Sequence, residues 1–380
     1  MYFDLSKPQK LLQQSVRDFC KREIPISRVR ALMETDSAMD DSLWMEMAEQ
    51  GWIGLHLDEQ YGGLGLGPVE LSVVAEELGR ACVPGPWLST NWAATLLASI
   101  GGPVASELLP GVFDGSTRIT IAALEEQGSW SFDPAVMETR LSENGKKTVT
   151  EAVTVNVLNG RKYLVQHAQQ ADHLLCVAGV DDELCLLTIP VASDGLRITS
   201  TPGIDATRKV YQCDFSNVPI RRDQILARGD EARQALQQSQ NVAMVAVCSE
   251  MLGILQWLLK TTVEYAKSRK QFDRVIGSFQ VVQHMCADLL LLTESARSAV
   301  WNAAWALQEN LDANRAVAVA KVYVSDAVRK AGNLAVQSHG GIGFTWEHDL
   351  HLYYKRAKAD EYLFGDATFH RERLAEMILG

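Results

Sequence analysis

The chain has 380 residues, of which 47% are hydrophobic and 22% are charged, as in a folded protein with a sizeable core. Its formal net charge of -11 argues against a nucleic-acid partner, because phosphate binding depends on clustered lysine and arginine. Seven scattered cysteines, without a C-x-x-C pair or the spacing of a zinc site, predict reduced and mostly buried thiols. We therefore expect an acidic cytoplasmic protein without a metal site.

The sequence predicts neither a secretory signal nor a membrane-spanning helix. The first residues lack a basic region followed by an apolar stretch. No uninterrupted apolar stretch approaches the roughly 18 residues that a spanning helix needs.

Short helices are predicted at the N-terminal end, because apolar residues recur at spacings of three and four over residues 10–100. The glycine-rich stretch 62–67 predicts a loop, and Pro68 suits the first turn of the helix after it. We expect an N-terminal helical domain over residues 1–117.

Near residue 118 the apolar period changes to two, which predicts short strands. The segments are rich in Val, Ile, Leu and Thr, and Asn159-Gly160, Asp181-Asp182 and Asp194-Gly195 are predicted turns between them. We expect a middle antiparallel β domain over residues 118–225. Its predicted strands are residues 118–123, 153–158, 173–177, 183–190 and 210–215.

The helical period returns after the β domain and holds to the end of the chain. Long helices are predicted at residues 232–269, 278–309, 313–339 and 351–379. They form a C-terminal four-helix bundle over residues 226–380. Strands and helices do not alternate and no G-x-G-x-x-G follows a strand, so the fold class is α+β and not a Rossmann fold.

This layout resembles the acyl-CoA dehydrogenase family over essentially the whole chain. The matching motifs, in chain order, are residues 58–65 (DEQYGGLG), 269–272 (RKQF), 276–280 (IGSFQ) and 337–344 (QSHGGIGF). The resemblance implies a tetramer in which FAD is shared across each dimer interface. It also implies that a carboxylate removes the α-proton of an acyl-CoA while a hydride passes to the flavin, with an electron-transferring flavoprotein as acceptor.

The C-terminal motifs contain groups suited to the nucleotide half of FAD. Arg269 can fork onto a diphosphate, Phe272 can pack on adenosine, and glycines at a turn let backbone N–H groups approach phosphate. The alternatives are that Arg269 and Phe272 only end a helix and that the glycines only form a turn between helices. The cofactor-binding residues implied are Arg269, Gln271, Phe272, Gln280, Gln337, Gly340 and Gly341.

The flavin-ring half of the family pattern is missing. Leu124 stands where a family hydroxyl meets the flavin, and residues 163–166 (YLVQ) lack the family's tryptophan and hydroxyl after an Asn-Gly-x-Lys turn. The resemblance therefore implies that this chain holds the flavin ring poorly. In the nucleotide motif, Asp273 is a departure as well, since it replaces a glycine that the family usually has beside Phe272.

The family's catalytic carboxylate is missing as well. An ungapped alignment puts Phe364 at the commonest base and Gly365 at its small neighbour, and phenylalanine cannot accept a proton. Other members carry the base on the first bundle helix, where this chain has Ala243, and Met244 replaces an arginine that holds the acyl-CoA.

Glu250 is the remaining candidate base. It lies two turns further along the first bundle helix, among small and apolar residues whose desolvating effect raises a carboxyl pKa. The alternative is a buried structural partner of an arginine from an adjoining helix or subunit. Asp366 and Glu347 are expected to be helix caps, and capping or surface positions are expected for His339, His348 and His351.

Three hypotheses follow. The first is a half-site subunit of an α2β2 heterotetramer, like those that degrade steroid side chains, which desaturates the α,β bond of a bulky CoA thioester and completes the FAD site of a related catalytic subunit. The second is a self-sufficient homo-oligomeric acyl-CoA dehydrogenase that uses Glu250 as its base. The third is a non-enzymatic assembly subunit without flavin contacts.

Overall fold

The computed structural model describes residues 4–143 and 156–380. The described chain forms two units, each built from segments that are far apart in the sequence. The first unit takes residues from Met1–Ala31, Gly67–Val83 and Met244–Gly380, and the second takes residues from Leu32–Leu66 and Pro84–Ala243. Helices α2 (Ile26–Met33) and α7 (Gly229–Ser268) each have residues in both units.

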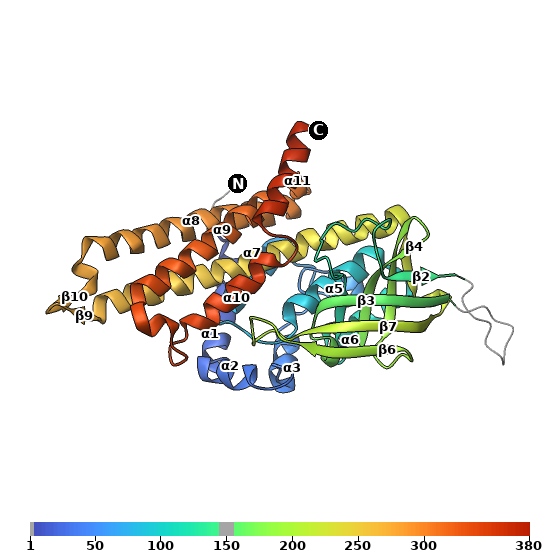
Figure 1. Ribbon diagram of the computed structural model, residues 1–380, viewed down its shortest axis with the longest axis horizontal. Coiled ribbons are helices and arrows are strands. Elements are labelled where there is room, and N and C mark those ends of the chain that lie inside the picture. Colours follow the sequence, from blue (N-terminus) through green and yellow to red (C-terminus); the bar gives the residue numbers. More distant parts are fainter. Residues whose placement is uncertain (1–3, 144–155) are drawn as a thin grey trace. The chain divides into compact units, whose positions relative to one another are not determined.

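The first unit is helical. Helix α9 packs against α8, α10 and α11 (Figure 1). Helix α4 packs against α1 and α8. Buried valines and alanines of α9 recur at spacings of three and four, as a core-facing helix requires. The helices are α1 (Lys7–Glu23), α4 (Pro68–Arg80), α8 (Gln280–Gln308), α9 (Ala313–His339), α10 (Leu350–Tyr362) and α11 (Ala367–Leu379), with a short hairpin of β9 (Lys270–Gln271) and β10 (Arg274–Val275).

Helices α4 and α7 meet at two glycines. A Cβ atom on Gly253 of α7 would lie 1.9 Å from the Glu76 carbonyl oxygen, and one on Gly79 of α4 would lie 2.2 Å from the Glu250 carbonyl oxygen. Any side chain at either position would force the backbones apart. The two glycines therefore fix the depth at which Glu250 enters the helical core.

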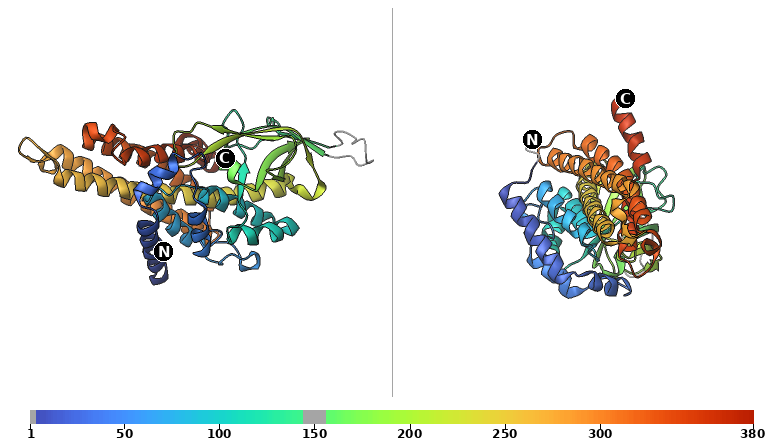
Figure 2. Two further views of the ribbon diagram at one scale, coloured as in Figure 1. Left: turned by 90° about the horizontal axis from the view of Figure 1, so that it is seen from below. Right: turned by 90° about the vertical axis from the view of Figure 1, so that its left-hand side faces the viewer.

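The second unit combines helices α3 (Asp41–Glu49), α5 (Trp87–Ile100) and α6 (Gly102–Phe113) with an eight-stranded sheet. The strand order is β6-β7-β3-β2-β4-β5-β8, with β1 also beside β4. Helices α5 and α6 lie on one side of the strands (Figure 2). The strands are β1 (Ile119–Ala122), β2 (Arg140–Ser142), β3 (Asn156–Gln166), β4 (His173–Val180), β5 (Glu183–Pro190), β6 (Leu196–Thr201), β7 (Val210–Ile220) and β8 (Ile225–Arg228).

The predicted fold class is confirmed, with three local corrections. First, the middle sheet is mixed, since β1 and β2 run parallel to β4. Second, Asn159-Gly160 lies inside β3 and is not a turn between strands; Gly160 has a φ of 138° and lies against Thr139, so its glycine serves a close approach at a register shift. Residues 153–155 of the predicted second strand lie outside the described residues.

The third correction is the last predicted helix, 351–379, which is two helices. Phe364 and Gly365 both have left-handed backbone conformations, with φ of 62° and 96°, and end the run between α10 and α11. Asp366 then accepts a hydrogen bond from the Phe369 N–H at 2.9 Å and caps α11, as expected for that acid. The periodicity continues across the break, which is why the sequence pattern hid it.

Helix α7 is long and apolar enough to span a membrane by length and composition alone, although it contains no uninterrupted apolar stretch of that length. However, 78% of its most apolar 18-residue window is buried within the protein, as in the core helix of a soluble protein. All seven cysteines are free; six are buried and Cys286 is half-buried, which confirms the expected state of the thiols. The predicted limits of the three domains remain a proposal.

Candidate functional site

The motif at 269–272 forms a hairpin after α7 ends. Phe272 and Asp273 occupy the two turn positions between β9 and β10, with φ of 51° and 61°, so the turn presents the Phe272 ring to solvent. The ring is 86% exposed and touches Phe279 edge to face, while the Arg274 guanidinium lies 4.0 Å from the Phe279 ring centroid. Figure 1 shows the hairpin at the end of the helical unit, and Phe272 is therefore an exposed aromatic group at that end.

The motif at 337–344 lies at the end of α9. Gly340 has a φ of 64°, which favours glycine, and a short 3-10 helix, η5 (Gly340–Phe344), follows. Tyr265 of α7 stacks on His339 with ring centroids 4.4 Å apart, and its hydroxyl lies 3.4 Å from the His339 carbonyl oxygen. The structure thus brings the end of α7, which Arg269 follows, to the end of α9, which the glycines follow.

These residues fit a diphosphate-containing ligand. A Cβ atom at Gly340 or Gly341 would meet nothing within 4 Å, so the space above the turn is open. Among residues 4–143 and 156–380, the exposed side chains of Arg269, Gln271 and Gln280 have no hydrogen-bond partner, and neither has Gln337. Their donors remain available to a nucleotide, as expected for FAD.

Glu250 lies on the buried apolar face predicted for it, at 5% exposure. It forms an ion pair with Arg356 of α10, which is 1% exposed and also donates to the Val83 carbonyl oxygen at 3.1 Å. The alternative interpretation of Glu250, as the buried partner of an arginine from another helix, matches this contact. Its role as a base is not tested by the structure. Ala243 and Met244, further back on α7, are also buried.

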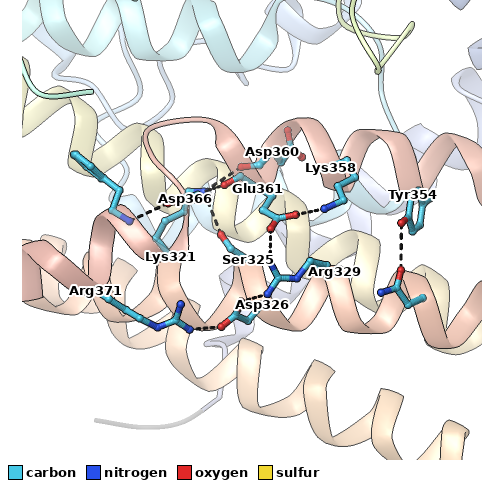
Figure 3. Close-up of polar contacts among 12 residues, drawn as sticks. Lys321, Ser325, Asp326, Arg329, Tyr354, Lys358, Asp360, Glu361, Asp366 and Arg371 are labelled. Carbon is cyan, nitrogen blue, oxygen red and sulfur yellow. Dashed lines mark hydrogen bonds and ion pairs between the residues drawn. The ribbon is translucent and has the colours of Figure 1, made fainter. Parts of the chain in front are cut away.

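Phe364 lies in the reversal between α10 and α11, and its side chain is 4% exposed. The nearest acid along α10, Glu361, is buried and lies 3.0 Å from Arg329 and 2.9 Å from Lys358 (Figure 3). Both of its oxygens are therefore held by cations.

A buried lysine missed by sequence reasoning supports the same reversal. Lys321 of α9 donates to the carbonyl oxygens of Asp360 at 3.1 Å and Glu361 at 2.8 Å, and to the Ser325 hydroxyl at 3.2 Å (Figure 3). Burial lowers the pKa of Lys321 to about 8. A cation at the carboxyl end of α10 satisfies carbonyls that the helix leaves open. The signal was a single lysine within an otherwise apolar run of α9.

The segment after β1, where the family holds its flavin ring, is tied to the sheet by a buried ion pair. Lys162 donates to the Ala123 carbonyl oxygen at 3.0 Å and to the Glu125 carboxylate at 2.8 Å. Burial raises the pKa of Glu125, but the charge and hydrogen bond of Lys162, with hydrogen bonds from the Glu138 and Thr139 N–H groups, lower the pKa overall. Leu124, between the two acceptors, is buried, while Leu164 on the bulge of β3 is exposed with a φ of 51°.

The histidines near η5 take local roles. The His348 Nδ1 atom accepts the Leu350 N–H at 3.0 Å and so caps α10. The backbone carbonyl oxygen of Glu347 accepts a hydrogen bond from the Arg30 guanidinium at 3.4 Å. The Asp349 carboxylate forms an ion pair with the same guanidinium at 2.8 Å. Within the described ranges, three or more His, Cys, Asp or Glu side chains do not gather into a metal-binding group.

Comparisons with known proteins agree with this fold and these motifs. Residues 6–116 match the description "Acyl-CoA dehydrogenase, N-terminal domain", and residues 233–379 match "Acyl-CoA dehydrogenase, C-terminal domain". The acyl-CoA dehydrogenase IpdE2 of Mycobacterium tuberculosis is 30% identical over 353 residues, covering 92% of this chain and 90% of that protein. The chain therefore belongs to the acyl-CoA dehydrogenase family, whose members use FAD.

Two solved structures are also similar. A variant of the Tcur3481-Tcur3483 steroid ACAD has a TM-score of 0.86 and 30% identity, with 98% of each chain covered. The ChsE4-ChsE5 complex from Mycobacterium tuberculosis has a TM-score of 0.88, covering 100% of this chain and 99% of that chain, and at 24% identity it supports the fold alone.

Proposed function

We propose that this acyl-CoA dehydrogenase is a half-site subunit, which supplies the nucleotide-holding residues of an FAD site to a related catalytic subunit. The complex would introduce an α,β double bond into a bulky CoA thioester, such as one with a steroid side chain. The observation that carries the proposal is an asymmetry within one chain. The nucleotide-facing residues are open and unsatisfied, while Phe364 fills the position of the family's base.

Exposed apolar groups support a partner at the nucleotide-facing end. Phe272 is 86% exposed and Phe344 is 77% exposed, and Trp346 and Ile342 are also exposed nearby in the sequence. Large exposed apolar side chains are typical of a surface that another protein covers. The occupant we propose is the related catalytic subunit, since the adjacent Arg269 and Gly340 would then reach a cofactor held by that subunit.

The acids of this chain support the absence of its own base. A general base needs an oxygen that can reach the substrate proton. Glu250 is paired with Arg356, and Glu361 is paired with Arg329 and Lys358. These contacts weigh against the self-sufficient enzyme with Glu250 as base. Buried Leu124 and Met244 likewise offer no polar contact to a flavin or to the acyl-CoA.

Relatives guide the remaining parts of the proposal. One similar structure is named a steroid ACAD, and another is named as a complex of ChsE4 and ChsE5. By analogy we propose a bulky steroid-like acyl-CoA substrate and an α2β2 heterotetramer with one FAD per heterodimer. A cytoplasmic location and an electron-transferring flavoprotein as electron acceptor complete the proposal.

Substitution of Arg269 tests the proposal against the assembly-only alternative. The experiment compares Arg269→Met with the neighbouring exposed cation changed, Lys270→Met, each co-expressed with a related subunit that carries the family's glutamate. Loss of a charge-assisted, forked contact should weaken FAD binding by roughly ten- to a hundredfold. FAD content is read from visible absorbance of the purified complex. Full FAD content in the Arg269 variant would favour an assembly subunit without flavin contacts.

A further inference from the structure

Two imidazole rings lie edge to face next to the Gly340–Gly341 turn. His339, the last residue of α9, and His348 have ring centroids 4.8 Å apart. His339 is 4% exposed, whereas the two glycines that follow it are exposed. The ring of His339 is therefore buried directly before an exposed turn.

Backbone contacts fix where the protons of the two rings lie. His339 Nδ1 is 2.8 Å from the Ala335 carbonyl oxygen, which can only accept, so Nδ1 carries the proton. His348 Nδ1 accepts the Leu350 N–H, so the His348 proton is on Nε2. In the part of the chain that the structure describes, the His339 Nε2 atom is buried and has no hydrogen-bond partner.

His339 Nε2 is thus the nitrogen of the pair that can gain a proton without the loss of a backbone hydrogen bond. Protonation of His348 Nδ1 would break the bond that caps α10. Burial lowers the pKa of His339, and the neighbouring His348 lowers it further, whereas the hydrogen bond to the Ala335 carbonyl oxygen raises it. The other titratable and charged groups around the pair are Tyr265 on α7, Arg30 on α2, and Asp349, His351 and Lys355 at α10.

We propose that His339 takes up a proton when the diphosphate of a dinucleotide binds at the Gly340–Gly341 turn. The inference rests on the proposed function, because it assumes that the turn holds the nucleotide half of FAD. A proton from solvent adds to the Nε2 lone pair, and no covalent bond breaks. The charge of the diphosphate and the face of the Tyr265 ring both stabilise the imidazolium that forms.

Proton uptake makes dinucleotide binding depend on pH. A ligand that raises the proton affinity of a group binds more tightly as the pH falls toward the pKa of that group in the complex. The nucleotide-facing end would therefore hold its ligand more strongly in mildly acidic solution than in alkaline solution. A site made only of Arg269 and backbone N–H groups would show no such dependence near neutral pH.

Calorimetric titration with ADP-ribose tests the inference, because the diphosphate diester of this probe has no group that titrates near neutral pH. The 380-residue chain, or its co-purified complex after removal of bound FAD, is titrated at about pH 6 in two buffers of different ionisation enthalpy. The expected result is net proton uptake in the native protein. Uptake should vanish in His339→Asn, whose amide can keep the contact with Ala335, and persist in His173→Asn, which changes a histidine of the other unit.

The outcomes separate this inference from the proposed function. ADP-ribose binding without proton uptake, or equal uptake in His339→Asn, would overturn the role of His339 and leave the half-site proposal standing. Absence of ADP-ribose binding to the FAD-depleted complex at every pH would overturn both. His339→Gln, whose amide lies near the Nε2 position, provides a second variant if His339→Asn fails to fold.

Discussion

At the scale of single residues, the contact between Glu250 and Arg356 favours a structural role for Glu250. A carboxylate on an apolar helix face can be a base or half of an ion pair, and the local sequence is the same in both cases. The two residues are 106 positions apart, and the fold brings them together in the core. The guanidinium occupies an oxygen that a substrate proton would need.

We predict that Glu250→Gln mainly lowers stability. Removal of one partner from a buried ion pair leaves the other charge uncompensated and typically costs about 3 to 5 kcal/mol. Urea denaturation measures the loss. Asp4→Asn serves as the control, because the Asp4–Lys10 pair is exposed and such pairs contribute at most about 1 kcal/mol.

The opposite pattern would support Glu250 as a base. In that case Glu250→Gln would keep its stability and bound FAD while turnover of the enzyme fell by roughly a hundred- to ten-thousandfold.

Residue-scale prediction from sequence was uneven for physical reasons. The sequence singles out Arg269, Gln337 and Gly340 because their chemistry is local to two short motifs, and their cofactor-binding roles stay a prediction. Partners such as Arg356 and Lys321 were not identifiable, since their roles depend on a contact with a distant helix. The sequence therefore does not indicate which residues neutralise its buried charges.

At the scale of elements, the reversal between α10 and α11 depends on buried polar groups. His370 of α11 donates from Nε2 to the Phe364 carbonyl oxygen at 2.9 Å, and its Nδ1 atom is buried without a partner in the described chain. Burial lowers the pKa of His370 to about 4, from an ordinary value of 6.5. The unfolded chain therefore binds more protons than the folded chain between these two values.

We predict that stability falls as the pH drops from about 6.5 toward 4, because unfolding is then accompanied by protonation of His370. His370→Gln should make this slope shallower, since its amide can still donate to Phe364 but does not titrate. His56, whose pKa burial also lowers to about 4, should leave a residual slope. Urea denaturation at a series of pH values measures how stability depends on pH. Equal slopes in the native protein and in His370→Gln would contradict the role of His370.

Two glycine substitutions separate packing from ligand binding. Gly253→Ala should destabilise the protein by at least about 1 to 3 kcal/mol, because its Cβ atom would overlap the Glu76 carbonyl oxygen on α4. Gly341→Ala meets open space and should leave stability unchanged, yet weaken FAD retention by the complex. Thermal denaturation and FAD content give the two readings. Unchanged FAD retention in Gly341→Ala would argue against a ligand at this turn.

Elements were predicted well where periodicity was long and poorly where it was short. The main helices and five strands of the β domain follow from apolar spacing. The three-residue strand β2 and the break at Phe364 have no periodic signal of their own. Gly160 resembled a turn residue because the sequence does not reveal a close approach to Thr139.

At the scale of the whole molecule, this acyl-CoA dehydrogenase has open polar groups at one end of its helical unit but apolar residues where the family's base and flavin contacts are expected. One end of the helical unit offers open glycines, unsatisfied polar side chains and exposed aromatic rings. The positions of the family's base and flavin contacts carry Phe364 and Leu124, both buried. A partner subunit that supplies the base and the flavin pocket accounts for both features.

The visible absorption spectrum of the purified chain, alone and co-purified with a related catalytic subunit, tests this account most directly. We predict that the lone chain is colourless or unstable and that the complex is yellow, with one FAD per heterodimer. A lone chain that carries stoichiometric FAD and bleaches when acyl-CoA is added would contradict the account.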